Sequence, residues 1–362
     1  MGERPLVEFE VGEGGGARSW RVSFPAMGTR VDLIGAGGDL PRITRGVCRL
    51  VAELEALWSV FRPDSDVSRI NSGEGWCEVD PRTDSLLLDS LALSEATGGA
   101  FTPLAGALAR LWDVKGARRS FLASGRVPEA PSQEEIDGAL RSCDPALLER
   151  DEAARWRLAR AVNGGAAPSR GPALDLGAIA KGATADAVRD AVVAAGAVGV
   201  LVSLGTSSIA AFGRRWDGRP WTVGLREPGA AENEWTGSVE LSSSSALSTS
   251  GDYAPASFDA GRPFPEALAH ETFDPRTGRP SESGVLQASV ICASGVMAEA
   301  LSTALLVAGE GYVDGARLDV WGRARGLSTR WERVVARRDG MAFSEGAGWV
   351  PKGARGTGGS AP

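Results

Sequence analysis

Two stretches of the chain place polar side chains at spacings that suit phosphate and metal chemistry. In residues 297–305, MAEALSTAL, Glu299 and Thr303 are four residues apart and therefore share one face of an apolar helix. A carboxylate and a hydroxyl so placed can hold a hard cation such as Mg²⁺ through oxygen ligands. The competing interpretation is a threonine bonded back to its own helix and a glutamate at the rim of the core. The pair taken alone favours that competing interpretation.

The second stretch, ALDLGAIAKGATADAV at 173–188, joins an apolar strand end to a helix through Asp175, Gly177 and Lys181. Such a loop can lay backbone N–H groups and a lysine against phosphate oxygens at a helix N-terminus. The spacing is not that of a Walker loop. Alone, the pattern favours an ordinary strand–loop–helix connection with a solvated lysine.

The single histidine, His270, precedes the turn FDPRTGRP at 273–280, which contains Asp274 and Thr277. A histidine in this place is a candidate general base, although a lone histidine is more often structural. The stretch STSGDY at 248–253 places Thr249 and Ser250 beside a glycine. It is typical either of a polar pocket rim or of a simple turn.

Hydrophobic periodicity predicts the elements that would position these residues. Residues 21–35 read as strand, turn and strand, with the turn at Met27–Gly28–Thr29. Residues 114–170 are more irregular, with one helix whose capping box joins Ser132 and Glu135. Helices are expected over 41–61, 83–99 (capped by Thr83 or Asp84), 132–140, 181–196 and 295–309. Short strands are expected over 199–205, 208–213, 220–225, 237–242, 245–250 and 287–293.

This order of elements predicts an α+β fold, with helices and largely antiparallel strands in one compact unit. We expect residues 1–18 to form a flexible, glycine-rich leader and residues 350–362 a disordered tail. The domain proper would then span 19–349.

Composition bounds the function. The 362 residues carry a formal net charge of −7, which argues against a general nucleic-acid or anionic-membrane surface. No stretch reaches the roughly 18 apolar residues of a membrane span, and the N-terminus lacks the basic start and apolar core of a signal peptide. Four cysteines without a CxxC pair argue against a zinc site or disulfide scaffold and fit a reducing compartment, namely Cys48, Cys77, Cys143 and Cys292. We therefore expect a soluble, cytoplasmic protein.

No single stretch is decisive, but their order is. MGT, FRPDSDVSRIN, GGAFTPLAGALARLW, DLGAIAKGATAD, SLGTSSIAAFG, RPWTVGLREP, STSGDY, DPRTGRP and AEALSTAL follow one another over residues 27–305. In this series the chain resembles the ApbE family, the FAD:protein FMN transferases. The resemblance implies a single T-fold-related domain that binds FAD. It also implies Mg²⁺-dependent cleavage of FAD, transfer of FMN to a Ser or Thr hydroxyl of a partner flavoprotein, and release of AMP.

The resemblance also implies roles for individual residues. Glu299, Thr303 and the backbone carbonyl of Ala180 occupy the metal-ligand positions, and Lys181 with its loop faces the phosphates. The candidate catalytic residues are His270, Lys181 and Asp274, together with Glu271, which stands at the position of the family's histidine. The implied FAD-binding residues are Met27, Phe61, Arg62, Asp64, Ser65, Asp175, Gly177, Lys181, Thr249, Ser250 and Thr277.

The chain departs from the family pattern at several of these positions. Glu299 stands where the family usually has Asp, and Gly177–Ala178 replaces a Gly-Gly pair. Thr102 and Ser207 stand where the family has acidic residues.

The family's histidine lies three residues before the Asp of its Asp-Pro-x-Thr-Gly turn. Here Glu271 holds that position, and His270 is one residue earlier. In a strand, a shift by one residue turns the side chain to the opposite face, unless a bulge restores it. His270 is therefore either a restored base or a displaced one, and a partly buried Glu271 is an alternative base.

Three functions fit these observations. The first is an active transferase that modifies a separate partner, because the chain lacks the family's acceptor motif and AIAKGAT has Lys181 at the acceptor position. The second is a divergent FAD-binding protein, either an FAD pyrophosphatase or a flavin-dependent enzyme of a specialised, natural-product pathway. The third is a non-catalytic flavin-binding scaffold, which the retained Lys181, Thr303 and DPRTG turn disfavour.

Overall fold

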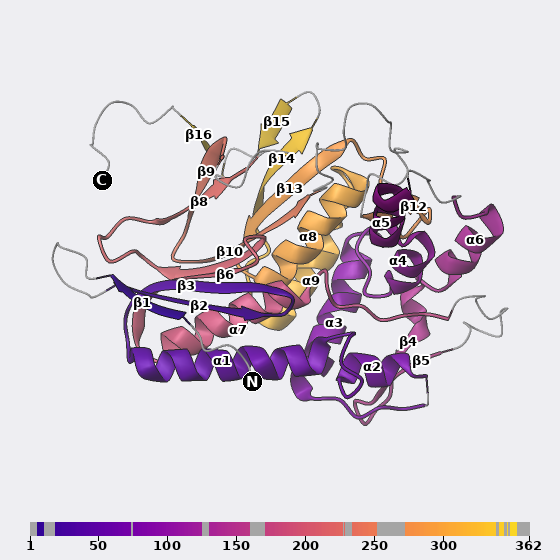
Figure 1. The fold of residues 1–362 in the computed structure, drawn as a ribbon, viewed down its shortest axis with the longest axis horizontal. Coiled ribbons are helices and arrows are strands. Elements are labelled where there is room, and N and C mark those ends of the chain that lie inside the picture. The colour runs from indigo at the N-terminus through magenta and orange to yellow at the C-terminus, as the bar shows by residue number, and fades with distance from the viewer. Residues whose placement is uncertain are drawn as a thin grey trace.

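The computed structural model describes residues 6–10, 19–73, 75–124, 130–159, 171–226, 228, 234–251, 272–337, 340–343, 346 and 348–352. Its centre is an antiparallel sheet whose described strands follow the order β1-β2-β3-β6-β7-β10-β13-β14-β15. The strands are β1 (Leu6–Glu10), β2 (Ser19–Ala26), β3 (Thr29–Gly37), β6 (Ala197–Leu204), β7 (Ser208–Gly213), β10 (Ser244–Gly251), β13 (Val285–Cys292), β14 (Trp331–Arg337) and β15 (Gly340–Phe343). The expected α+β architecture is thus confirmed (Figure 1).

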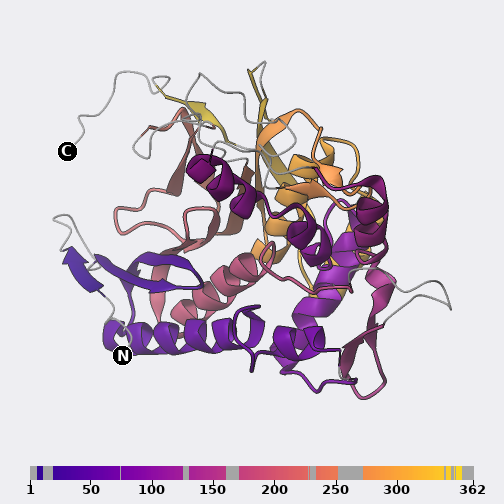
Figure 2. The ribbon, with the colours of Figure 1, turned by 45° about the vertical axis from the view of Figure 1, so that its right-hand side comes forward.

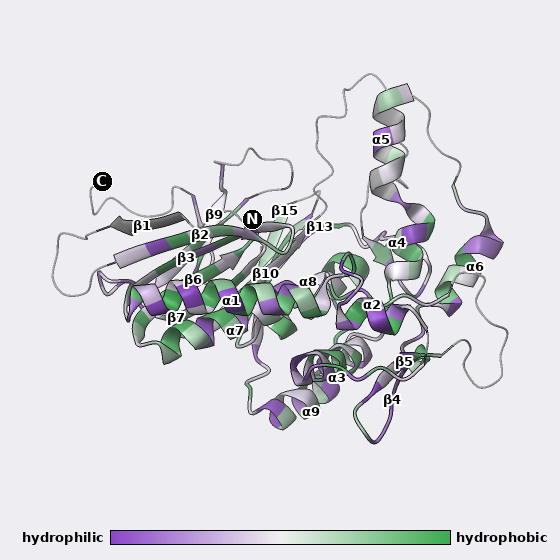
Figure 3. Ribbon diagram, turned by 60° about the horizontal axis from the view of Figure 1, so that its bottom comes forward, coloured by the Kyte–Doolittle hydropathy of each residue, from purple (hydrophilic) through white to green (hydrophobic). Residues whose placement is uncertain are grey.

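Three long helices cover one face of this sheet: α1 (Leu40–Trp58), α7 (Ala180–Ala194) and α8 (Gly295–Ala308). Figures 1 and 2 show α1 lying along β2 and β3. Its buried residues, among them Ile43, Val47, Val51 and Leu54, recur every three or four positions. In Figure 3, α1 alternates hydrophilic and hydrophobic residues, whereas α8 is largely hydrophobic, consistent with its nearly complete burial.

A small sheet covers the opposite face of the large one. Its order is β16-β9-β8, with β8 (Trp221–Leu225), β9 (Gly237–Leu241) and β16 (Val350–Pro351). Trp221, Leu225 and Val239 pack there against Ile209 and Leu247 of the large sheet. The large sheet is therefore buried on both faces where β7 and β10 run, and the polar side chains of these two strands need internal partners.

The remaining elements form a mostly helical part at one end of the molecule (Figure 1). They are α2 (Asp66–Asn71), α3 (Pro81–Ala96), α4 (Gly106–Trp112), α5 (Val114–Ser124), α6 (Gln133–Arg141), α9 (Gly315–Arg325), the 3₁₀ turn Pro145–Leu147, and the short strands β4 (Leu148–Arg150), β5 (Trp156–Leu158), β11 (Phe273–Asp274) and β12 (Arg279–Pro280). The β11–β12 hairpin contains the predicted Asp-Pro-Arg-Thr-Gly turn and brings it against α8.

Most of the predicted elements are confirmed, and two predictions were wrong. The helix expected over 83–99 begins at Pro81 and is capped by Asp80, because the Asp80 carboxylate accepts a hydrogen bond from the N–H of Arg82 and Pro81 suits the first helical position. The region 114–170 contains a second helix, α5, whose glycine and cationic residues weaken the apolar pattern. The capping box of Ser132 and Glu135 is present at the start of α6.

The ends of the described fold lie beyond the expected domain boundaries. Leu6–Glu10 pairs with β2, within the expected leader, and Val350–Pro351 pairs with β9, within the expected tail. Residues 1–5, 11–18 and 353–362 lie outside the described residues. None of the helices described is both long and apolar enough to cross a membrane.

Candidate functional site

A cavity of about 480 Å³ opens where the first turn of α7, the middle of α8 and the end of β10 meet α4 and the β11 turn. Its polar lining includes Lys181, Glu299, Thr303, Thr249 and Ser250, so the structure brings together five residues predicted from separate stretches. Gly177 also lines it. The apolar part of the wall includes Phe101, Phe273, Leu306 and Val307. The cavity thus joins a polar floor to an apolar wall, as small-molecule sites commonly do.

The packing of α7 against α8 sets the position of Lys181 relative to Glu299. Gly182 and Gly295 lie so close that a Cβ on either one would overlap the backbone of the other. The Asp186 carboxylate of α7 accepts hydrogen bonds from the N–H of Gly295 at 2.7 Å and the hydroxyl of Ser294 at 3.1 Å. Burial raises the pKa of Asp186 above its ordinary value, and the charge of Arg189 opposes that rise. These contacts fix the start of α8 against α7.

Glu299 is a buried carboxylate with 5% of its surface exposed. Ser208 donates a short hydrogen bond to its Oε1, and the hydroxyl of Ser248 and the N–H of Gly182 also donate to the carboxylate. Burial raises the pKa of Glu299 above its ordinary value, while the charge of Lys181 and these hydrogen bonds act in the opposite direction. The carboxylate is therefore held by neutral donors, in a place that favours a neighbouring cation.

Thr303 follows one turn later on α8 and lines the same cavity. Its Oγ1 lies 3.3 Å from the hydroxyl of Ser250, and Ser250 lies 2.9 Å from the hydroxyl of Ser302. The hydroxyl of Thr249 pairs with that of Ser289 at 2.8 Å. Side-chain hydrogen bonds thus tie the predicted ligand Thr303 to the sheet rather than to its own helix.

The loop before α7 is pinned from several sides. The side-chain amide of Asn71 donates to the Leu174 carbonyl at 2.9 Å and accepts from the Leu174 N–H at 2.8 Å. The Asp175 carboxylate accepts from the N–H of Gly177 at 2.8 Å, and the ammonium of Lys181 donates to the carbonyl of Gly177 at 3.3 Å. Asp175 therefore shapes the turn that carries Gly177 and Lys181. Asn71 closes the FRPDSDVSRIN stretch, and its position there was the only signal of its role.

The carbonyl of Ala180 belongs to the first turn of α7 and accepts a hydrogen bond from the Thr184 hydroxyl at 2.8 Å. With Glu299 and Thr303 it would give a set of three oxygen ligands carrying one charge. In the described residues, no cluster of three or more His, Cys, Asp or Glu is placed to hold a metal. A cation here would complete its shell with waters or substrate oxygens, as Mg²⁺ commonly does.

The β11–β12 turn borders the cavity through Phe273 and Pro275. The buried carboxylate of Asp274 accepts from the Arg276 guanidinium at 2.8 Å and 2.7 Å, and from the Arg276 N–H at 2.9 Å. Thr277 is exposed, and its hydroxyl accepts from the N–H of Arg279. Both residues are held within the turn and lie outside the cavity lining. The catalytic role predicted for Asp274 and the FAD contact predicted for Thr277 stay predictions.

Five residues predicted to contact FAD lie apart from the lining of this cavity. Phe61 is 92% exposed, Arg62 and Asp64 form a surface ion pair at 3.2 Å, and the Ser65 hydroxyl caps α2. Met27 is half-buried in the β2–β3 turn with a positive φ of 53°. Their FAD contacts stay predictions, and His270 and Glu271 lie outside the described residues.

Two of the departures from the family pattern fall inside the cavity. Thr102 and Ser207 both line it, so hydroxyls stand where the resemblance leads one to expect carboxylates. Among the described lining residues, Glu299 is the one carboxylate and Lys181 the one cation. The cavity therefore repels an anionic phosphate less than a site with three carboxylates would.

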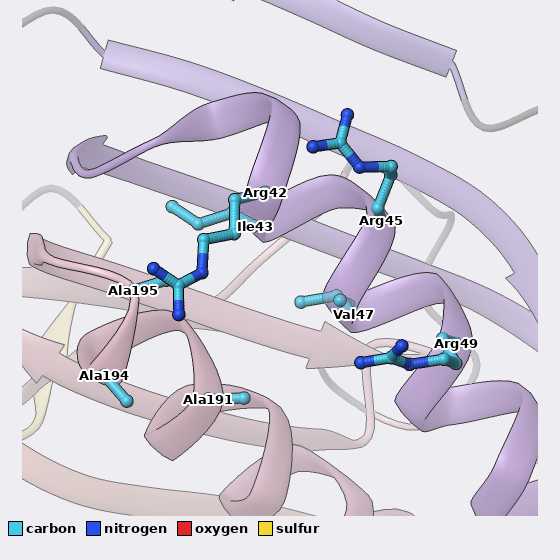
Figure 4. A pocket seen from close by; sticks show the side chains of 9 residues that line it. Arg42, Ile43, Arg45, Val47, Arg49, Ala191, Ala194 and Ala195 are labelled. Carbon is cyan, nitrogen blue, oxygen red and sulfur yellow. The ribbon is translucent and has the colours of Figure 1, made fainter.

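A second cavity, of about 330 Å³, lies between α1 and the C-terminal end of α7. Figure 4 shows Arg42, Arg45 and Arg49 along α1, beside Ala191 and Ala194 of α7. At a rise of about 1.5 Å per residue, Ala191 is about 15 Å along the helix from Lys181. This groove is separate from the candidate site.

The model of the ApbE family matches residues 27–316. The chain belongs to the ApbE family. The ApbE match spans every cavity-lining residue named above and the α7–α8 contact.

Curated relatives and solved structures agree with this assignment. A Vibrio cholerae protein named FAD:protein FMN transferase is 28% identical over 305 residues, covering 81% of this chain and 83% of the relative. A Rhodobacter capsulatus protein with the same name is 31% identical over 257 residues, covering 70% of this chain but only 43% of the relative. The ApbE protein of Thermotoga maritima superimposes with a TM-score of 0.69 at 26% identity, covering 90% of this chain and 97% of that one. The two curated relatives are transferases by name, and the Thermotoga maritima structure confirms the predicted fold.

Proposed function

We propose that this chain is a Mg²⁺-dependent FAD:protein FMN transferase. It cleaves the diphosphate of FAD, transfers FMN to a Ser or Thr hydroxyl of a partner protein and releases AMP. The observation that supports this best is the convergence of Lys181, Glu299 and Thr303 on one cavity. Their order along the chain is that of the ApbE family, and the curated relatives carry the name of this activity.

The donor set fits Mg²⁺. Glu299 offers a buried carboxylate, Thr303 a hydroxyl and Ala180 a backbone carbonyl, and hard cations prefer such oxygen ligands. The partners of the Glu299 carboxylate are hydroxyl and N–H groups, so among the described residues no contacting cation neutralises its charge. When bound, the cation would neutralise charge on the phosphate oxygens of FAD. Glu299 is one methylene longer than the family's Asp, and Ser208 on the sheet donates a hydrogen bond to its carboxylate.

The chain's own groups then position the reactants. Lys181 and the N-terminus of α7 face the diphosphate and favour its negative charge. The apolar wall formed by Phe101, Phe273 and Leu306 packs against the substrate and excludes water. The acceptor oxygen forms a bond to the FMN phosphorus while the bond from that phosphorus to the oxygen of AMP breaks. The hydroxyl proton passes to a base, for which His270 and Glu271 are the candidates.

The acceptor is a separate protein, because this chain contains no Asp-x-x-Ser/Thr-Gly-Ala-Ser/Thr stretch. The ammonium of Lys181, at the position where AIAKGAT comes nearest to that motif, reaches back to the carbonyl of Gly177. We therefore assign Lys181 to the lining of the cavity and not to the role of FMN acceptor.

The deciding experiment measures AMP released from FAD in the presence of Mg²⁺, with and without a carrier protein bearing an Asp-x-x-Thr-Gly-Ala-Thr site. AMP release together with a carrier mass increased by one FMN would establish transfer. AMP release without a carrier and an unchanged carrier mass would show FAD hydrolysis, the divergent alternative. Bound FAD without AMP in either reaction would reject the transferase function for this acceptor.

A further inference from the structure

The strands beneath α8 present a row of buried hydroxyls to the helix. Ser208 of β7 and Ser248 of β10 stand opposite each other in the antiparallel pair, so their side chains share one face. Ser250 lies two residues further along β10 and therefore faces the same way. Ser208 is 0% and Ser248 1% exposed. An apolar side chain would suit this layer better, so the hydroxyls require a specific explanation.

The facing side of α8 supplies a matching polar stripe. Glu299, Ser302 and Thr303 occupy positions i, i+3 and i+4 of a helix that is otherwise almost wholly apolar. Ser302 is 0% exposed, and residues on both sides of it, such as Leu301 and Ala304, belong to the main hydrophobic core. The two polar rows therefore meet inside the core and must satisfy each other.

At one end of this contact lies the carboxylate. Ser208 and Ser248 both donate to Glu299. The hydroxyl of Ser302 donates in turn to Ser248 at 3.2 Å. The carbonyl of Glu299, at 3.1 Å, is a second acceptor for the same Ser302 proton. Since a hydroxyl has one proton and two lone pairs, Ser248 gives its proton to the anion and accepts from Ser302.

At the other end lies Thr303. The hydroxyl of Ser250 is 2.9 Å from that of Ser302 and 3.3 Å from that of Thr303. Because the Ser302 proton is already donated toward Ser248 and the Glu299 carbonyl, Ser302 can only accept from Ser250. Ser250 therefore donates to Ser302 and accepts from Thr303. The proton of Thr303 then points at Ser250, into the protein. Its remaining lone pairs face the cavity that Thr303 lines.

We propose that Ser248, Ser250 and Ser302 are positioning residues that orient the two side-chain ligands of the divalent cation, Glu299 and Thr303. The chain of hydroxyls runs from Thr303 to Glu299, and every proton in it points toward the anion. This arrangement holds the Glu299 carboxylate in one rotamer and presents the Thr303 oxygen, rather than its proton, to the cation. The inference rests on the proposed function, which supplies the cation.

The test is cation affinity in the absence of flavin. The full-length protein is titrated with Mn²⁺ by electron paramagnetic resonance and with Mg²⁺ by calorimetry. We expect Ser302→Ala and Ser250→Ala each to weaken both affinities by roughly tenfold, as loss of an outer-shell partner commonly does. Ser250→Thr keeps the hydroxyl and should keep the wild-type affinity. In the AMP-release assay, Ser302→Ala should raise the Mg²⁺ concentration that gives half the maximal rate, and excess Mg²⁺ should restore the rate.

Ser90→Ala is the matched control, because Ser90 is as fully buried as Ser302 and its hydroxyl donates to the Leu86 carbonyl of its own helix. It should bind both cations like the wild type. Wild-type affinity in both Ser302→Ala and Ser250→Ala would overturn the positioning role while leaving the proposed function intact. A wild-type protein that binds neither cation would instead overturn the Mg²⁺ dependence itself, and this inference with it. Ser250 is only half-buried, so its variant remains informative if Ser302→Ala does not fold.

Discussion

The backbones of Gly182 and Gly295 are in direct contact where α7 crosses α8. The contact lies one residue from Lys181 and one helical turn from Glu299, so the closeness of the two helices sets the width of the cavity floor. A side chain at either glycine would push apart α7, which carries Lys181, and α8, which carries Glu299. The two glycines thus set the separation between Lys181 and Glu299.

This contact predicts the effect of Gly295→Ala. The added methyl group would overlap the backbone of Gly182, and overpacking of this kind costs about 1–3 kcal/mol. We expect a lower midpoint of urea unfolding and weaker Mg²⁺ binding. Gly46→Ala is the control, because a Cβ there meets no atom within 4 Å and an alanine in a helix interior stabilises by about 0.5–1 kcal/mol. Equal unfolding midpoints for the two variants would refute the close-contact explanation.

Lys181 is the one cationic side chain of the described cavity lining. Lys181→Met should therefore weaken the binding of the FAD diphosphate and slow its cleavage. Hydrogen bonds to charged groups contribute about 1.5–3 kcal/mol, which corresponds to roughly a 10- to 150-fold loss in kcat/KM for FAD cleavage. Lys352→Met removes an exposed lysine that lies over the ring of Trp235, and it should leave kcat/KM unchanged. A Lys181→Met protein with wild-type kinetics would show that Lys181 is solvated and does not face the phosphates.

Glu299→Gln keeps the size of the side chain and removes its charge. If Mg²⁺ binds the folded protein through Glu299, Mg²⁺ at 100 times Kd should raise the free energy of unfolding of the wild type by about 2.7 kcal/mol, and its melting temperature should rise accordingly. The Glu299→Gln protein should show no such rise. Glu310→Gln, which alters a surface ion pair with Arg333, should keep the full rise. A rise retained in Glu299→Gln would remove Glu299 from the ligand set.

The sequence was sufficient to predict the fold class and some of the polar residues that line the cavity, among them Lys181, Glu299 and Thr303, but it could not predict how they are held together. Lys181, Glu299 and Thr303 lie in stretches with recognisable local chemistry. Ser208 and Ser248 have no such signal, because the sequence does not show which face of the sheet a serine in a strand occupies. Their role depends on a strand register between residues 40 positions apart, and on which helix covers that face. Tertiary register of this kind leaves no trace in local periodicity.

Asp84 predicts a dependence of stability on pH. A hydrogen bond from Arg150 is the main cause that holds the pKa of the Asp84 carboxyl below its ordinary value, and Trp156 adds a second one. Because the folded pKa is lowered, the contribution is complete above the unfolded pKa of about 3.9 and is lost as the pH falls through the folded pKa. The midpoint of urea unfolding at pH 6 should therefore be higher for the wild type than for Asp84→Asn. The difference between the two midpoints should shrink below about pH 4. A difference that stays constant down to pH 3 would contradict this assignment.

The base can be identified from single variants at positions 270 and 271. The sequence-based expectation for 270–271 is an extended segment, in which adjacent residues point to opposite faces and one of His270 and Glu271 faces the acceptor hydroxyl. We expect one of His270→Ala and Glu271→Gln to slow FMN transfer by about 10²-fold or more, as loss of a general base commonly does, and the other to keep the wild-type rate. The pH–rate profile of the less affected variant then reports the base that remains, because a histidine loses its proton near pH 6.5 and a glutamate well below that. Wild-type rates in both variants would place the base elsewhere in the chain or in the acceptor protein.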